Sequence, residues 1–243
     1  MNIALIFAGG VGSRMHSKGR PKQFLEMYNK PIIIHTLEFF QNHPMIDAIV
    51  VVCIENWIPY LNDLLYKFGI KKVKRVVPGG KTGQISIYNG LKSTKEITNG
   101  ENAIVLIHDG VRPLITEKLI TNNINSVINY GSAITTAKVK ETILVINEAD
   151  ASIDYVPSRN NSRVAKAPQS FWLDDILSIH EKALENGEYD WVDSCTMMQK
   201  YGFKMHLIDG PSQNIKITTP EDFYTMRAIL EAQENAQIYG IDE

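Results

Sequence analysis

Basic side chains gather just after the first apolar run of the chain. Residues 3–8 read IALIFA, and Gly9, Gly10 and Gly12 follow almost at once. Four cations come next in a single short stretch: Arg14, Lys18, Arg20 and Lys22. Glycines allow backbone amides to approach phosphate oxygens, and arginine and lysine neutralise those oxygens. The segment favours a phosphate-bearing ligand, with a plain strand–turn–helix and a solvated basic flank as the alternative.

Neither of the two common phosphate loops is present. The dinucleotide fingerprint G-x-G-x-x-G fails because Met15 stands where its third glycine belongs, and no P-loop pattern occurs. We therefore expect the charged side chains, rather than a loop of backbone amides alone, to hold the phosphates.

A carboxylate follows another apolar run, in the stretch IHDGVRP at 107–113. If this run is a parallel strand, Asp109 lies at the same sheet edge as the glycine loop, where ligands of open α/β sheets bind. A carboxylate beside a polyphosphate is typical of a Mg²⁺ ligand, and Arg112 is placed to neutralise a second anion. The alternative is that Asp109 only caps a turn. The combination of glycines, cations and carboxylate at one edge favours a ligand site.

Alternating apolar runs and helical periodicities predict the elements that position these residues. Strands are predicted at 3–8, 48–54, 73–77, 103–108, 133–138, 143–146 and 204–208. Helices are predicted at 31–41, 57–68, 84–95, 116–130, 172–186 and 220–236, the last with Thr219 as its N-cap. This alternation predicts an α/β fold with an open, mostly parallel sheet and helices on both faces. Residues 139–165 interrupt this alternation of strands and helices. We interpret them as a β-arm on a single domain spanning 1–243.

Composition excludes several classes of function. The net charge is −2, so no global basic field favours nucleic acid or an anionic membrane. No apolar run approaches the length of a membrane span, and the N-terminus does not read as a signal peptide. Cys53 and Cys195 form no metal-binding spacing, and no Ser-His-Asp or Cys-His arrangement is evident. We expect a cytoplasmic protein that binds neither nucleic acid nor membrane.

The order of the short motifs resembles that of the polyol-phosphate cytidylyltransferases, which include enzymes for ribitol 5-phosphate and for 2-C-methyl-D-erythritol 4-phosphate. The motifs are AGGxGSRM, PKQF, a Gly-Gly pair near residue 80, HDxxRP, xPQxF and NIKITxPEDx. They span essentially the whole chain. The resemblance implies a Rossmann-like nucleotidyltransferase fold and a reaction in which CTP and a polyol phosphate give a CDP-polyol and pyrophosphate.

The resemblance also implies roles for individual residues. Arg14 and Lys22 match the stabilisers of the transition state, and Asp109 matches a Mg²⁺ ligand that also contacts the nucleotide. The remaining nucleotide-binding positions are Ala8, Gly9, Gly10, Gly12, Gly80 and Ser86.

Four further residues match the family's acceptor site. Arg159 and Lys216 fall on catalytic positions that orient the second substrate, while Arg112 and Thr142 fall near the acceptor phosphate. In this family the arm is exchanged across a homodimer, which would deliver Arg159 from residues 139–165 to the neighbouring site.

Some positions depart from the family pattern and bear on the acceptor. Gly83 stands where an arginine is usual, Ala167 where a threonine is usual, and Gln213 where the methylerythritol-phosphate enzymes tend to carry aspartate. Gln213, WVDSCTMM at 191–198 and the opening AGGVGSRM favour ribitol 5-phosphate, with methylerythritol phosphate as the alternative.

Two alternatives of another kind stay open. One is a non-catalytic nucleotide-binding protein, which the joint presence of Arg14, Lys22, Asp109 and Lys216 argues against. The other is a glycosyltransferase of similar topology, which usually needs a D-x-D metal motif, whereas 107–113 holds a single aspartate.

Overall fold

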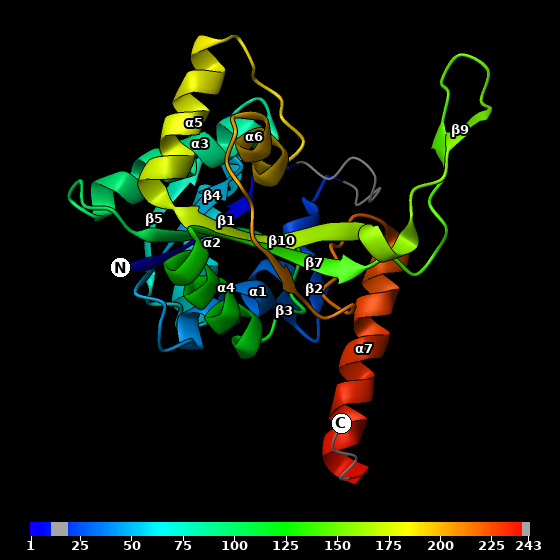
Figure 1. Ribbon diagram of the computed structural model, residues 1–243. Coiled ribbons are helices and arrows are strands. Elements are labelled where there is room, and N and C mark those ends of the chain that lie inside the picture. The colour runs from blue at the N-terminus through cyan, green and yellow to red at the C-terminus, as the bar shows by residue number, and fades with distance from the viewer. Residues whose placement is uncertain (11–18, 240–243) are drawn as a thin grey trace.

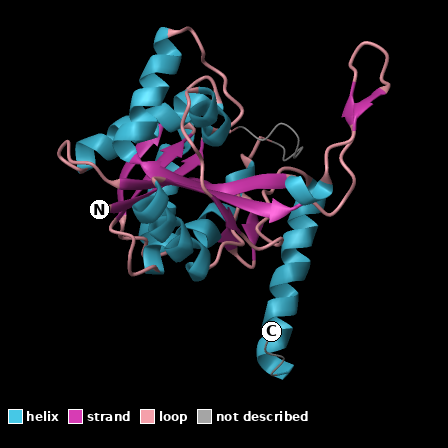
Figure 2. Cartoon of the chain, in the orientation of Figure 1, coloured by secondary structure: helices cyan, strands magenta, loops and turns pink. Residues whose placement is uncertain are grey.

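A seven-stranded sheet forms the centre of the protein (Figures 1 and 2). The computed structural model describes residues 1–10 and 19–239, with side chains described as far as residue 235. The strands of this sheet are β1 (Asn2–Ala8), β4 (Ala48–Cys53), β5 (Val73–Pro78), β6 (Ile104–Asp109), β7 (Ser132–Lys138), β10 (Arg163–Trp172) and β11 (Leu207–Asp209). The helices are α1 (Ile32–Asn42), α2 (Ile58–Lys67), α3 (Gly83–Ile97), α4 (Glu117–Tyr130), α5 (Leu173–Glu185), α6 (Ser194–Lys200) and α7 (Pro220–Tyr239).

The strand order is β11-β7-β10-β6-β1-β4-β5. Strands β4 and β6 flank β1 and run parallel to it, whereas β10 is antiparallel to both of its neighbours, β6 and β7. The chain leaves β1 toward β4 and β5 and later returns to β6 on the other side of β1. This reversal is a topological switch point, and in open α/β sheets such a point opens a crevice for ligands at the carboxyl ends of the strands.

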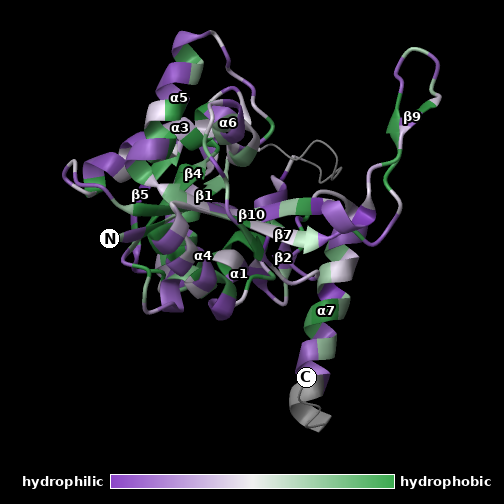
Figure 3. Cartoon of the chain, in the orientation of Figure 1, coloured by the Kyte–Doolittle hydropathy of each residue, from purple (hydrophilic) through white to green (hydrophobic). Residues whose placement is uncertain are grey.

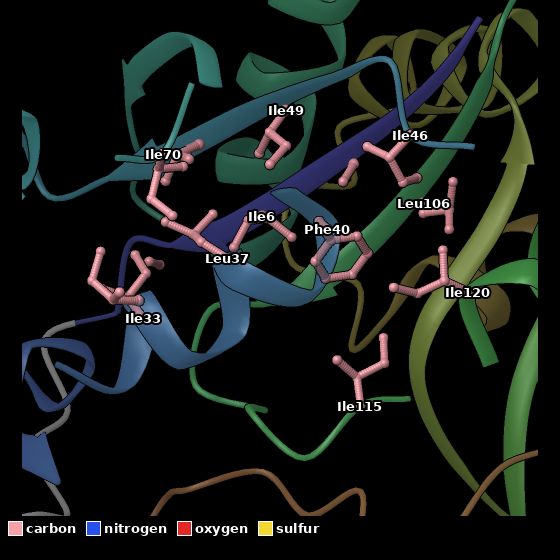
Figure 4. Close-up of a cluster of buried hydrophobic side chains, with 14 of the residues drawn as sticks. Ile6, Ile33, Leu37, Phe40, Ile46, Ile49, Ile70, Leu106, Ile115 and Ile120 are labelled. Carbon is pink, nitrogen blue, oxygen red and sulfur yellow. The ribbon is translucent and has the colours of Figure 1, made fainter. Parts of the chain in front are cut away.

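Helices cover both faces of the sheet because the central strands are apolar on both sides. Every residue of β4 and of β6 is buried. Helices α1, α2 and α4 pack on one face, where Ile6, Leu37, Phe40 and Leu106 meet in one cluster (Figure 4). Helices α3, α5 and α6 pack on the other face around Leu5 and its neighbours. Two-sided burial of this kind is typical of parallel sheets.

The predicted fold class is confirmed, and the predicted helices are all present. Threonines cap α3 and α4: the Oγ1 atoms of Thr82 and Thr116 accept hydrogen bonds from backbone amides in the first turns of these helices. For α7, the Thr219 amide donates to Asp222 Oδ2 and the Asp222 amide donates to Thr219 Oγ1, which closes a reciprocal cap. None of the described helices is both long and apolar enough to cross a membrane.

Several elements were not predicted, and three predicted boundaries were wrong. Strand β10 and helix α6 are additional, and β10 begins at Arg163, so the last residues of the predicted arm at 139–165 belong to the main sheet. The predicted strand at 143–146 is shorter, as β8 (Val145–Ile146), and the one at 204–208 begins later, as β11.

The rest of the arm stands away from the body of the protein (Figure 1). Strand β8 pairs with β9 (Ile153–Tyr155) in a small antiparallel hairpin, and η4 (Arg159–Asn161) follows it. Its apolar side chains lie in solvent: Ile146, Ile153 and Tyr155 are each more than half exposed, and Figure 3 shows this apolar character on the hairpin. An exposed apolar hairpin of this kind marks an interaction surface.

Candidate active site

Asp109 lies at the switch point and joins the charged residues there. It ends β6 directly beside Phe7 of β1, and the residue is only 5% exposed. Its Oδ1 atom lies 2.6 Å from Lys216 Nζ, and its Oδ2 atom accepts a 3.1 Å hydrogen bond from Arg112 Nε. The predicted neighbours Asp109, Arg112 and Lys216 are therefore brought together as one contact group.

The two cations keep this buried carboxylate ionised. Burial by itself would raise the pKa of Asp109, but the charges of Lys216 and Arg112 outweigh it and hold the pKa below its usual value. A carboxylate that is charged at neutral pH at the edge of a sheet is suited to contact a cation or to organise the groups that bind an anion.

Lys216 is carried by a loop that is fixed against the end of β6. The Ile217 amide donates to the Val111 carbonyl at 2.9 Å, and Arg112 Nη1 donates to the Asn214 carbonyl at 2.8 Å. Asn214 and Ile217 are fully buried, whereas the Lys216 side chain is 41% exposed. This segment is a loop that presents the ammonium group of Lys216 to the crevice.

The two predicted glycine segments pack against each other at Gly9 and Gly79. A Cβ on Gly9 would stand 3.3 Å from Ser86 Oγ, and one on Gly79 would stand 3.2 Å from the same atom. Ser86 Oγ accepts from the Gly80 amide at 3.0 Å and donates to the Thr82 carbonyl at 2.8 Å. A Cβ on Gly80 would stand 2.2 Å from Ile85, so that position needs glycine. Glycine here provides the close approach of the first and second loops.

The basic segment after β1 is anchored at the strand's end. Gln23 is buried in the short helix η2 (Lys22–Phe24), and its Nε2 atom donates to the Ala8 carbonyl at 2.6 Å. The backbone of Lys22 is therefore held next to the first glycine loop. Gly12, predicted to bind the nucleotide, and Arg14, predicted to stabilise the transition state, lie outside the described residues.

A cavity of about 330 Å³ opens beside Asp109. It is lined on one side by Asp109, Arg112 and Lys216, and on the other by residues of α3, β10 and α6. These additional residues include Gln84, Lys166, Gln169, Asp193 and Ser194. None of these five was predicted as a site residue, because they come from three separate segments that only the fold brings together.

The polar wall of the cavity is held by hydrogen bonds between distant segments. Gln169 Nε2 donates to Asp193 Oδ2 at 3.0 Å, and its Oε1 atom accepts from the Cys195 amide at 2.8 Å. Gln84 Oε1 accepts from the Trp191 amide at 3.0 Å. The cavity therefore has a charged region at Asp109 and a fixed, largely uncharged polar region, which suits a ligand with an anionic group and a polar chain.

Two predicted site residues lie elsewhere. Arg159 Nη2 donates to Thr142 Oγ1 at 3.2 Å, and both side chains are exposed on the arm. Neither lines the cavity of its own chain. The structure brings Arg159 and Thr142 to each other but not to Asp109.

His108 is a packed residue, as the sequence indicated. It is fully buried, its Nε2 atom lies 3.0 Å from the Arg112 carbonyl, and its ring packs on Phe40. Burial lowers the pKa of His108 to about 4, so the imidazole is neutral near pH 7. Its contact with the Arg112 backbone supports the turn that carries that arginine.

Comparison with known proteins relates nearly the whole chain to cytidylyltransferases. The family model described as "IspD: 2-C-methyl-D-erythritol 4-phosphate cytidylyltransferase" matches residues 2–232. The chain is 55% identical over 240 residues to a ribitol-5-phosphate cytidylyltransferase of Vibrio parahaemolyticus serotype O3:K6, covering 99% of this chain and 100% of that one. It is 41% identical over 230 residues to a 2-C-methyl-D-erythritol 4-phosphate cytidylyltransferase of Clostridium botulinum, covering 95% and 97%.

A solved structure shows the same fold. The 4-diphosphocytidyl-2C-methyl-D-erythritol synthase of Anaerococcus prevotii superposes with a TM-score of 0.81 at 27% identity, covering 95% of this chain and 96% of that one. With the family model matching nearly the whole chain and the charged edge in place, the protein belongs to the IspD family of cytidylyltransferases.

Proposed function

We propose that the protein transfers CMP from CTP to D-ribitol 5-phosphate and releases pyrophosphate. The observation that carries this proposal is the Asp109–Arg112–Lys216 group, which stands between the two glycine loops and a cavity with a polar wall. The choice of acceptor is supported by the 55% identity to a ribitol-5-phosphate cytidylyltransferase, against 41% to a methylerythritol-phosphate enzyme.

In this proposal the nucleotide binds at the glycine loops and the acceptor at the cavity. Backbone at Ala8, Gly9 and Gly10 approaches the triphosphate, and Gly80 with Ser86 approaches the cytosine and ribose. A phosphate oxygen of the acceptor then attacks the α-phosphorus of CTP, while the bond from that phosphorus to the leaving pyrophosphate breaks. Chemistry of this kind needs positioning and neutralised charge rather than a covalent nucleophile.

The residues fit a Mg²⁺ ion that arrives with the nucleotide. Among the described residues no three acidic, histidine or cysteine side chains gather to hold a metal by themselves. Asp109 nevertheless offers one ionised carboxylate beside the proposed triphosphate site, and Mg²⁺ is typically bound by one or two carboxylates together with phosphates and waters. Bound there, Mg²⁺ would neutralise charge on the triphosphate.

The acceptor site is completed in our proposal by a second subunit. Arg112 and Lys216 would contact the acceptor phosphate from one chain, while Thr142 and Arg159 reach it from the arm of the partner. The arm's exposed apolar hairpin supports this arrangement, because it would be buried in a homodimer. Arg159 donates a hydrogen bond to Thr142, which supports the proposal that the arm presents both residues to the same site.

Mixed dimers test the exchange of the arm. Asp109→Asn disables the body of a chain and Arg159→Ala disables its arm, so each variant alone is expected to be nearly inactive. Co-expression should restore about a quarter of wild-type activity, because random pairing makes half of the dimers mixed and each mixed dimer has one intact site. No recovery above the sum of the two variants would show that the arm serves its own chain.

A substrate panel tests the function itself. Pyrophosphate release should require CTP among the four nucleoside triphosphates. With CTP, kcat/KM for ribitol 5-phosphate should exceed that for 2-C-methyl-D-erythritol 4-phosphate by at least about 10²-fold, because hydroxyl contacts left unmade are costly. Preference for the branched substrate would overturn the proposal, and activity with neither would point to another polyol or sugar phosphate.

A further inference from the structure

Lys166 is a cation in the cavity wall that pairs with no acid among the residues the structure describes. It lies half-buried on β10 and lines the cavity. Its Nζ atom donates to the carbonyls of Ser212 and Asn214, each at 3.0 Å. No carboxylate within the described parts of the chain lies at ion-pair distance from it.

The surroundings of Lys166 add positive rather than negative charge. The Asn214 carbonyl that accepts from Lys166 also accepts from Arg112. Burial lowers the pKa of Lys166, and the charges of Arg112 and Lys140 lower it further. The two carboxylates that line the same cavity have other partners: Asp109 contacts Arg112 and Lys216, and Asp193 accepts from Gln169.

A half-buried cation beside other cations is costly unless an anion balances it. Two of the three N–H donors of Lys166 are used by carbonyls, which leaves the third for a ligand. The cavity that Lys166 lines is therefore expected to bind an anion at this position.

The position of β10 decides which substrate that anion belongs to. Strand β10 lies on one side of β6, whereas β1, β4 and β5, which lead into the two glycine loops, lie on the other. With neighbouring strands about 4.8 Å apart, β10 and β1 are separated by roughly 10 Å. Within the sheet, Lys166 therefore lies across β6 from the strands that lead into the glycine loops, while the cavity that it lines also reaches Phe7 of β1 and Gly83 of α3.

We propose that Lys166 binds the phosphate of the acceptor together with Arg112 and Lys216. This inference rests on the proposed function for the identity of the acceptor, but not for the presence of an anion site. Its two carbonyl bonds hold the ammonium in place before the acceptor arrives, so little side-chain freedom is lost on binding.

Steady-state kinetics of Lys166→Met test this contact. The KM for ribitol 5-phosphate should rise by roughly 10- to 100-fold, since charge-assisted hydrogen bonds are the strong ones. The KM for CTP and kcat should stay within about threefold, because the contact is made equally before and during the reaction. Lys118→Met is the matched control: it removes the same group from an exposed position on α4 and should leave every constant unchanged.

Two more variants separate charge from structure. Lys166→Arg keeps the charge and should recover most of the acceptor affinity, whereas Lys166→Gln keeps an N–H donor for the carbonyls but should behave like the methionine variant. If Lys166 only held the Lys216 loop in place, kcat would fall instead and Lys166→Gln would be close to wild type. That outcome would overturn the proposal.

Inorganic phosphate gives a test that does not depend on the acceptor. Phosphate should raise the melting temperature of the wild-type protein and inhibit competitively against the acceptor, and both effects should weaken in Lys166→Met but not in Lys118→Met. If ribitol 5-phosphate is not a substrate but this difference persists, the proposed function fails and the anion site stands. Equal phosphate binding by wild type and Lys166→Met would overturn the anion site itself.

Discussion

Asp109→Asn is expected to lower kcat/KM by about 10³-fold without unfolding the protein. The substitution keeps the size of the side chain but removes its charge. It also turns an NH2 group toward either Arg112 or Lys216, so that a donor faces a donor. Both cations would lose their anchor at the position where we place the reacting phosphates. Pyrophosphate release, with circular dichroism to confirm folding, measures the effect.

The control for this substitution is Asp209→Asn, at an exposed position that ends β11 of the same sheet. It should leave activity near wild type. The proposed metal role predicts in addition that EDTA abolishes wild-type activity and that Mg²⁺ restores it. Full turnover in EDTA would contradict the metal role, and near-normal activity of Asp109→Asn would contradict the whole site.

Lys22→Ala and Arg14→Ala are each expected to lower kcat by about 10²-fold or more, with a smaller change in CTP binding. Charge builds up around the α-phosphate and pyrophosphate as the transition state forms, so a cation placed there matters most at that stage. Lys22 is positioned for this because its neighbour Gln23 is bonded to the Ala8 carbonyl. Single-turnover rates at saturating substrates and direct CTP titration separate the two quantities.

Arg20→Ala is the matched control for these two variants. Arg20 belongs to the same basic run, but its Nη2 atom donates to Glu26 at 3.0 Å and to the Tyr60 hydroxyl at 2.7 Å, both on the protein. Its loss should have little effect on kcat. Turnover near wild type in Lys22→Ala or Arg14→Ala would show that the assigned role is wrong.

The parts of the fold that were predictable are those with local signals. Strands β1, β4 and β6 are continuous apolar runs, and the helices carry clear periodicity, with threonine caps on α3 and α4. Strand β10 was not predicted because RVAKAPQSFW contains a proline and changes character along its length. Its first residues are exposed, whereas its last ones cross the core next to β6. Proline is rare in a central strand, and here the register of β10 on β7 shifts between Ala165 and Gln169.

The same limit applies to the site. Asp109 and Arg112 stand three residues apart at the end of an apolar run, so local sequence was enough to single out both, although not to predict their ion pair. Gln169 and Asp193, or Gln84 and Trp191, meet only because the chain folds, and their sequence positions carry no sign of it. Lys166 was not predicted for a further reason. Its distinguishing feature is that no acid among the described residues pairs with it, and this cannot be judged before the fold is known.

The two halves of the crevice differ in how readily evolution can alter them. The half that we propose to bind the nucleotide is built from glycine backbone, and a side chain at Gly80 would collide with Ile85. Most substitutions there would therefore destabilise the fold. The cavity half relies on side chains from β10, α6 and the Lys216 loop, which can be exchanged one at a time. Because of this division, substitutions can change the acceptor specificity while the reaction with CTP is retained. A single ancestral scaffold could in this way give rise to enzymes for linear and for branched polyol phosphates.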